Sequence, residues 1–269
     1  MATAATTPFV TLPGGSFEMG EGGPMAYAAD GEYLRAAMVA PFAICATSVT
    51  NAEFGSFVDT TGYVTEAESF GWSFVFAGLL PNDFEATAAV VGTPWWRQVF
   101  GACWKHPEGR GSALHQRLDH PVVHVSWNDA QSYARWVGAR LPTEAEWEFA
   151  ARAGTTTIFP WGDDLEPGGS HMMNVFQGSF PTANTVADGW LGTCPVTEYP
   201  PNSFGLHNML GNVWEWTSDP FSAVSRDTIV VKGGSYLCHA SYCRRYRPAA
   251  RMANTRDSSA GNVGFRIAR

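Results

Sequence analysis

The sequence predicts one α+β domain with little regular secondary structure, and three observations support this fold class. The 269 residues contain neither an internal repeat nor a segment with the composition of a linker, so a single domain over residues 1–269 is expected. The 28 glycines and 17 prolines favour turns and loops. Periodicity typical of helices is clear only near residues 50–62 and 126–152.

The N-terminal part is expected to contain short strands followed by a helix. Residues 9–20 indicate two β segments hinged at Pro13-Gly14-Gly15. A helix is predicted from Thr50, because Thr50 and Glu53 have the spacing of a capping box and Gly62 is a suitable end point. The apolar face of this helix comprises Phe54, Phe57 and Val58.

The middle of the chain divides into an irregular part and a regular part. Residues 64–118 are rich in glycine, proline and aromatic residues, and we expect a long, ordered, irregular excursion there. Residues 122–125 predict a short strand, and residues 126–129 the start of a helix. The pattern Thr143-x-x-Glu146 is a capping box and predicts a second helix. The rest of the chain is expected to form loops and short strands.

Charge and composition exclude several classes of partner. The formal net charge is −8 and no basic block is present, so we expect no nucleic-acid partner. No apolar run approaches the ~20 residues of a membrane span, and residues 1–11 lack the features of a signal peptide. We therefore expect a cytoplasmic protein. A monomer is a separate expectation. The 11 tryptophans favour either core packing or a cleft that grips a peptide.

The five cysteines are too few and too scattered for a disulfide scaffold: Cys45, Cys103, Cys194, Cys238 and Cys243. The last two lie five positions apart, among hydroxyl, aromatic and arginine side chains. Thiolates suit soft metals, above all Cu(I), and nearby arginines favour the thiolate. A local disulfide or two inert core cysteines are the alternatives. One pair falls short of the four ligands of a structural zinc site.

The sequence around this pair closely resembles the C-terminal core of the formylglycine-generating enzymes, also called sulfatase-modifying factors. The resemblance starts at Gly233-Gly234-Ser235-Tyr236 and continues to Arg266. Further matching blocks cover most of the chain from about residue 9: Pro13–Gly20, Trp72–Phe76, Pro94–Trp96, Trp104–Gly109, His120–Ala130, Arg140–Glu148, Phe159–Gly162 and Gly211–Trp216.

The resemblance implies both a fold and an activity. Members of this family are compact α+β domains, distantly similar to C-type lectins. They oxidise the cysteine of a Cys-x-Pro-x-Arg motif in unfolded sulfatase polypeptides to Cα-formylglycine. O₂ is the oxidant and Cu(I) the cofactor.

The resemblance also implies a set of site residues. Cys238 and Cys243 would bind Cu(I). The pocket for oxygen and the substrate thiol would be lined by Ser235, Trp214, Tyr242 and Arg245. Each of these four has a simpler alternative role, at a strand end, in the core or in a surface ion pair. The partner of the substrate arginine is expected within residues 64–118.

Two structural Ca²⁺ ions are a further implication of the resemblance. The first site would use Asn174, Asp188 and the carbonyls of Val175 and Trp190. The second would use Asn208, Glu215 and the carbonyls of Gly211 and Val213. Hard oxygen donors of these types suit Ca²⁺. Ordinary turn chemistry of asparagine and aspartate is the alternative.

Departures from the family pattern define the rival interpretations. Pro248 and Ile267 stand where secretory members have disulfide cysteines, which favours the bacterial, cytoplasmic type. Residues 21–40 match poorly, and Arg256 replaces a common proline. An inactive class of relatives lacks the cysteine pair that this chain retains. An iron-dependent sulfoxide synthase would need a His-x3-His-x-Glu pattern, which is absent. A non-catalytic binding module is the third alternative.

Overall fold

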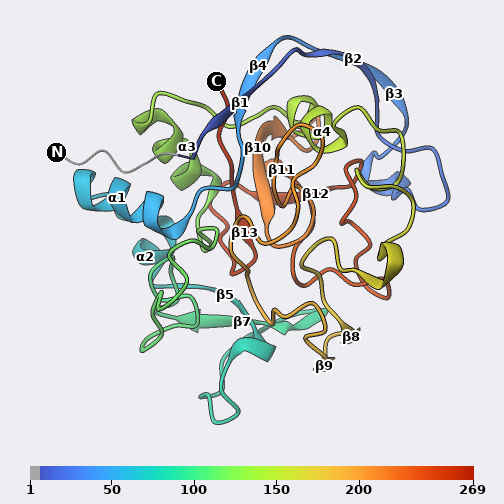
Figure 1. The fold of residues 1–269 in the computed structure, drawn as a ribbon. Helices are drawn as coiled ribbons and strands as arrows, with labels where there is room; N and C mark the ends of the chain where they lie inside the picture. Colours follow the sequence, from blue (N-terminus) through green and yellow to red (C-terminus); the bar gives the residue numbers. More distant parts are fainter. Residues whose placement is uncertain (1–6) are drawn as a thin grey trace.

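The computed structural model describes residues 7–269, so residues 1–6 of the predicted domain lie outside the described residues. Figure 1 shows short helices and strands joined by long loops, which confirms the α+β fold class. The α-helices are α1 (Asn51–Thr61), α2 (Glu66–Phe70), α3 (Trp127–Trp136) and α4 (Glu144–Arg152). The 3-10 helices are η1 (Ala28–Asp30), η2 (Ala77–Leu79) and η3 (Pro167–Gly169). Between residues 7 and 269, no helix has the length and apolar character needed to cross a membrane.

All four α-helices begin with a complete capping box. The predicted boxes that start α1 and α4 are confirmed, and Gly62 ends α1 with a left-handed φ of +68°. Helix α2 was not expected. Its Thr65 and Glu68 satisfy each other's backbone N–H groups in the same way, so the missed helix carried the same signal as the others.

In the described part of the chain, the strands form one four-stranded, one three-stranded and three two-stranded sheets. The four-stranded sheet has the order β12 (Arg251–Thr255), β11 (Thr228–Lys232), β10 (Trp214–Pro220) and β13 (Val263–Gly264). The three-stranded sheet has the order β5 (Trp72–Phe76), β7 (Thr93–Phe100) and β6 (Ala89–Val90). The small sheets pair β1 (Phe9–Leu12) with β4 (Phe42–Cys45), β2 (Gly15–Met19) with β3 (Arg35–Val39), and β8 (Gly178–Ser179) with β9 (Ala183–Asn184).

Two expectations for the middle of the chain were wrong. The segment predicted to be irregular is so only in part, because α2 and the β5–β7–β6 sheet form within it. The strand predicted at residues 122–125 does not form. There, Val122 donates its N–H to Val49 and His124 donates to Ala260, so neighbouring residues bond to two different segments. The left-handed φ of +58° at His124 interrupts any regular ladder.

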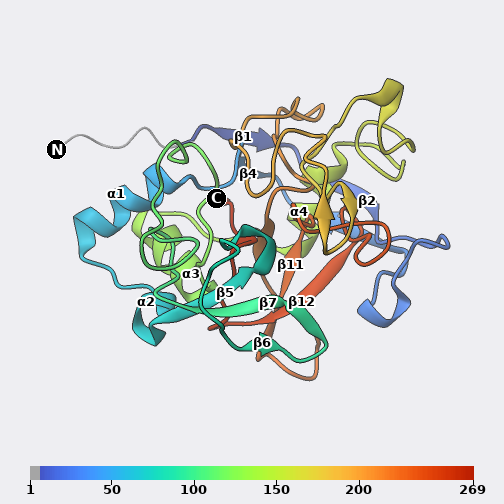
Figure 2. The ribbon, with the colours of Figure 1, turned by 90° about the horizontal axis from the view of Figure 1, so that it is seen from below.

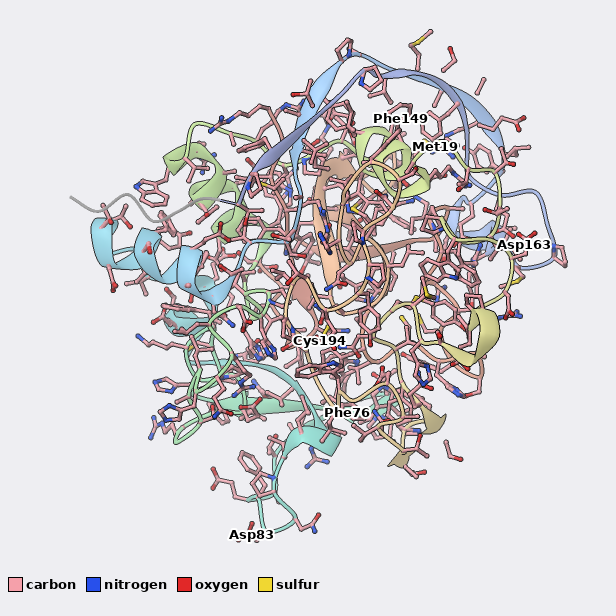
Figure 3. All side chains as sticks on the ribbon, in the orientation of Figure 1. Met19, Phe76, Asp83, Phe149, Asp163 and Cys194 are labelled. Atoms are coloured by element: carbon pink, nitrogen blue, oxygen red, sulfur yellow. The ribbon has the colours of Figure 1, made fainter. Side chains whose placement is uncertain are left out.

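The core combines aromatic and aliphatic side chains and lies around the four-stranded sheet. Helix α4 packs against β10 and β11 (Figure 1) and buries Trp147 completely. Trp214 and Trp216 of β10 are also buried, and with Trp147 and Trp104 they make four buried tryptophans among the 11 of the sequence. Core packing thus accounts for fewer of the tryptophans than expected. Figure 3 shows side chains filling the interior, and Cys194, labelled there, is fully buried.

The three-stranded sheet lies next to the C-terminal half of the chain. Figure 2 shows β5, β7 and β6 of this sheet together, seen from below. A β-bridge between Phe74 and Ala260 joins β5 to the segment that precedes β13. This contact brings the three-stranded sheet against the region that contains the cysteine pair. The sheet forms one wall of the cavity described next.

Candidate active site

Two glycines turn the chain from β11 toward the cysteine pair. Gly233 and Gly234 have positive φ angles of +98° and +77°. A Cβ on Gly233 would lie 2.8 Å from the carbonyl oxygen of Met209, and one on Gly234 would lie 2.9 Å from the Cα of Tyr246. Both the backbone conformation and the close packing therefore require glycine. The Gly-Gly-Ser-Tyr motif is thus a tight, packed turn at the end of a core strand.

Two short turns then bring the cysteines together. The N–H of Cys238 donates to the carbonyl of Ser235 at 2.8 Å, and the N–H of Cys243 donates to that of His239 at 2.7 Å. The two Sγ atoms lie 3.1 Å apart, and both thiols are free. This separation exceeds the ~2.05 Å of a disulfide bond. The five-residue spacing therefore places both sulfurs at one point in the structure.

All six residues that the resemblance implied line one cavity of about 350 Å³: Trp214, Ser235, Cys238, Tyr242, Cys243 and Arg245. The opposite wall comes from the β5–β7–β6 sheet and includes Phe74, Trp95 and Trp96. Trp95 contacts Tyr242 edge to face, with ring centroids 4.9 Å apart. The structure therefore brings every predicted pocket residue together, and some tryptophans line a cleft as well as the core.

The two thiols differ in acidity. A hydrogen bond with Cys238 and the adjacent Arg245 lower the pKa of Cys243 to about 7. Burial and the neighbouring Cys243 hold the pKa of Cys238 well above its ordinary value. As the pH rises, the first proton is therefore lost from Cys243, while Cys238 keeps its own.

Sequence reasoning missed Asn262 as a member of this site. Its Nδ2 donates to the Ser235 hydroxyl at 3.0 Å, and Ser235 Oγ also accepts from the N–H of Leu237 at 3.3 Å. The Ser235 N–H points at the Cys238 sulfur, 3.4 Å away. Asn262 lies inside the matching C-terminal block, but no spacing rule links it to Ser235. Only the fold brings the two residues together.

The cysteine pair fits a soft, low-coordinate ion. Among residues 7–269, no three His, Cys, Asp or Glu side chains are grouped so that they could hold a metal. The protein therefore provides two sulfur ligands at this place. Two thiolates suit Cu(I), but they are fewer than the four ligands of a structural zinc site.

The first predicted calcium set has the features of a cation site. Asn174 Oδ1 and Asp188 Oδ2 are buried, and neither has a hydrogen-bond partner in the described chain. Asn174 is oriented by its Nδ2, which donates to the carbonyl of Gly192 at 2.8 Å. Burial raises the pKa of Asp188, against hydrogen bonds from the backbone of Trp190 and Val175. Buried oxygens without donors fit a hard cation such as Ca²⁺.

The second predicted calcium set does not fit calcium in the same way. Asn208 Oδ1 is buried without a partner in residues 7–269, but the carboxylate of Glu215 is fully engaged. Its Oε2 accepts from Arg266 Nε at 2.6 Å and from Trp147 Nε1 at 2.7 Å. Its Oε1 accepts from Arg266 Nη2 at 2.8 Å and from Ser48 Oγ at 2.7 Å. Glu215 therefore acts as the buried counter-ion of Arg266.

A larger cavity, of about 410 Å³, lies away from the cysteines and is lined by His120, His124 and Trp190 among others. It contains none of the six predicted site residues. We place the chemistry at the smaller cavity, because the two sulfurs, Arg245 and an aromatic wall meet there.

Known proteins match this chain along almost its full length. Residues 2–269 match the family described as "Sulfatase-modifying factor enzyme 1-like domain". A formylglycine-generating enzyme of Streptomyces coelicolor is 52% identical over 276 residues, covering 96% of this chain and 88% of that protein. The inactive C-alpha-formylglycine-generating enzyme 2 of Bos taurus is 44% identical, covering 100% and 90%.

The solved structure of PvdO from Pseudomonas aeruginosa is similar in fold, with a TM-score of 0.66 and 26% identity. The similarity covers 97% of this chain and 93% of PvdO. The family match, the curated relatives and the shared fold agree with the motifs and with the geometry of the cysteine turn. The chain belongs to the sulfatase-modifying factor family, that of the formylglycine-generating enzymes.

Proposed function

We propose that this protein converts the cysteine of a Cys-x-Pro-x-Arg motif in unfolded sulfatase chains to Cα-formylglycine, with O₂ as oxidant and Cu(I) as cofactor. The observation that carries the proposal is the 3.1 Å meeting of Cys238 and Cys243 in a cavity that holds all the other implied residues. The inactive relatives show that family membership alone does not decide activity, so the cysteine pair is the deciding feature.

The residues of the cavity have distinct tasks in this proposal. Cys238 and Cys243 would hold Cu(I), which when bound supplies the one-electron chemistry that O₂ requires. Arg245 places a positive charge beside the sulfurs and favours their thiolate forms, and that of an incoming cysteine. Ser235, fixed by Asn262, presents a hydroxyl next to Cys238. Trp214, which is 2% exposed, closes the inner wall against water.

A second hollow adjoins the cysteine cavity and suits the arginine of the substrate. Phe74 and Ser258 line both, and the second is also lined by Phe70, Trp72 and Asp257. An aromatic face and a carboxylate are the two groups that bind a planar guanidinium well. The cysteine and the arginine of the motif are four residues apart, ~13 Å in an extended peptide, so they would occupy separate hollows. We therefore propose that the arginine of the substrate binds to aromatic residues of the segment 64–118 and to Asp257.

A synthetic Cys-x-Pro-x-Arg peptide should be converted in the presence of copper and O₂, as followed by mass spectrometry. Replacing its cysteine with serine should stop conversion, because a hydroxyl is a harder and less acidic ligand than a thiol. Replacing its arginine with alanine, or Asp257 with Asn in the enzyme, should mainly raise KM. Equal conversion of a scrambled cysteine peptide would instead indicate a nonspecific thiol oxidase.

Calcium is proposed as a structural ion at the Asn174 and Asp188 site, where two buried oxygens have no hydrogen-bond partner in the described chain. A ligand that binds only the native state at ~100 times its Kd stabilises it by ~2.7 kcal/mol. EDTA should therefore lower the Tm, and added Ca²⁺ should restore it. Asp188→Asn should remove most of this response, as measured by calorimetry. A Tm that is indifferent to chelation would identify these residues as ordinary turn formers.

A cytoplasmic, monomeric enzyme is the remaining part of the proposal. The five cysteines are all free in the described structure, which suits a reducing compartment. Reduced thiols are also the state in which the pair could receive Cu(I). Sedimentation at micromolar concentration should give a mass near 29.1 kDa. A stable dimer would contradict the monomer.

A further inference from the structure

The segment between β2 and β3 packs against the arginines that surround the cysteine pair. This segment, residues 20–34, includes η1 and lies largely within residues 21–40, which match the family pattern poorly. Asp30 Oδ2 accepts from Arg245 Nε at 2.7 Å and from Arg245 Nη2 at 2.6 Å. The Tyr27 ring lies under the Arg245 guanidinium, with 4.0 Å from its carbon to the ring centroid.

The same segment is anchored next to this contact by separate interactions. Tyr27 Oη accepts from the backbone N–H of Arg244 at 3.1 Å. Arg247, which is fully buried, pairs with Glu32 at 2.8 Å and also with Glu21. These bonds hold the segment against the arginine run independently of Arg245. The segment that carries Tyr27 and Asp30 is therefore held in place by bonds that do not involve Arg245.

Arg245 joins this segment to the active-site cavity. It lines the cavity with Cys238 and Cys243, whereas Tyr27 and Asp30 do not. Its side chain is 21% exposed and that of Asp30 20%, so the ion pair is largely shielded from water. One edge of the guanidinium is held by the carboxylate and one face by the ring, and Arg245 also interacts with the side chain of Cys243.

We propose that Tyr27 and Asp30 are positioning residues that fix the Arg245 guanidinium at the cysteine pair, with its remaining N–H groups directed at the reacting sulfur. An arginine side chain has many rotamers, and a carboxylate on one edge with an aromatic ring on one face selects among them. The role in catalysis rests on the proposed function, but the fixation of Arg245 itself does not.

The first test measures fixation of Arg245 in the metal-free protein, by ¹⁵N relaxation of its side-chain Nε–H. The wild-type group should be as rigid as the backbone. Asp30→Asn and Tyr27→Leu should each make it mobile, whereas Asp30→Glu and Tyr27→Phe should keep it ordered. Glu21→Gln is the matched control, because it removes a carboxylate from the same segment that binds Arg247 instead. An Arg245 Nε–H that stays rigid in both Asp30→Asn and Tyr27→Leu would overturn the proposal.

The second test measures catalysis with the copper-loaded enzyme and the Cys-x-Pro-x-Arg peptide. Asp30→Asn should lower kcat about tenfold with little change in KM or Tm, and Asp30→Glu should restore most of it. Combined with Arg245→Lys, Asp30→Asn should add no further loss, since both act through one guanidinium. Full additivity, or a loss matched by Glu21→Gln, would reject positioning. A wild-type enzyme without formylglycine product would reject the proposed function and leave the relaxation test to decide the fixation of Arg245.

Discussion

Cys238→Ser and Cys243→Ser are each expected to abolish tight Cu(I) binding and formylglycine formation. Each variant leaves one sulfur where two now lie 3.1 Å apart, and one thiolate is too few protein ligands to hold the ion tightly. The serine hydroxyl does not replace the lost thiolate, because the hydroxyl stays protonated at neutral pH. Competition against a chromophoric Cu(I) chelator measures the first effect, and mass spectrometry of the peptide measures the second.

Cys103→Ser provides the matched control for this prediction. Cys103 is also a buried free thiol, but it does not line the cysteine cavity, and burial raises its pKa. Its replacement should leave copper affinity and turnover unchanged. Wild-type activity in either Cys238→Ser or Cys243→Ser would overturn the copper site. Binding of Zn²⁺ in place of copper, with no oxidation, would overturn the oxidase.

Among the variants considered, Arg266→Met is expected to lower the free energy of unfolding most. Arg266 and Glu215 are both almost fully buried, and the arginine makes two hydrogen bonds to the carboxylate. Removing the cation leaves Glu215 as an uncompensated charge among Trp147, Ser48 and the core, which costs about 3–5 kcal/mol. For a domain of this size the Tm should fall by roughly 10 °C.

Arg140→Met is the matched control for the buried pair. Arg140 also binds one glutamate, Glu146, through two nitrogens, but its side chain is 44% exposed. Water screens the remaining charge there, so the expected loss is below ~1 kcal/mol. Chemical denaturation measures the free energy of unfolding of both variants. Equal losses in Arg266→Met and Arg140→Met would show that the destabilisation does not depend on the burial of Glu215.

Local patterns predicted the helices better than the strands. The box of Thr143 and Glu146 satisfies backbone donors within one turn, so it acts without help from the rest of the chain. The strand predicted at 122–125 failed because its N–H groups bond to two distant segments. The β5–β7 ladder in the supposedly irregular region has its partners about 20 to 30 residues apart, and no local pattern encodes that pairing.

The turn that holds the cysteine pair follows from local sequence, because Gly233, Gly234 and the five-residue spacing act over one short stretch. The family resemblance predicted which side chains would share the cavity. The contacts of those side chains depend instead on the tertiary structure. Asp30 lies 215 positions from Arg245, and Glu215 lies 51 from Arg266. A carboxylate can pair with any arginine that the fold brings near. Its partner is therefore set by packing between distant segments, which no spacing along the chain reveals.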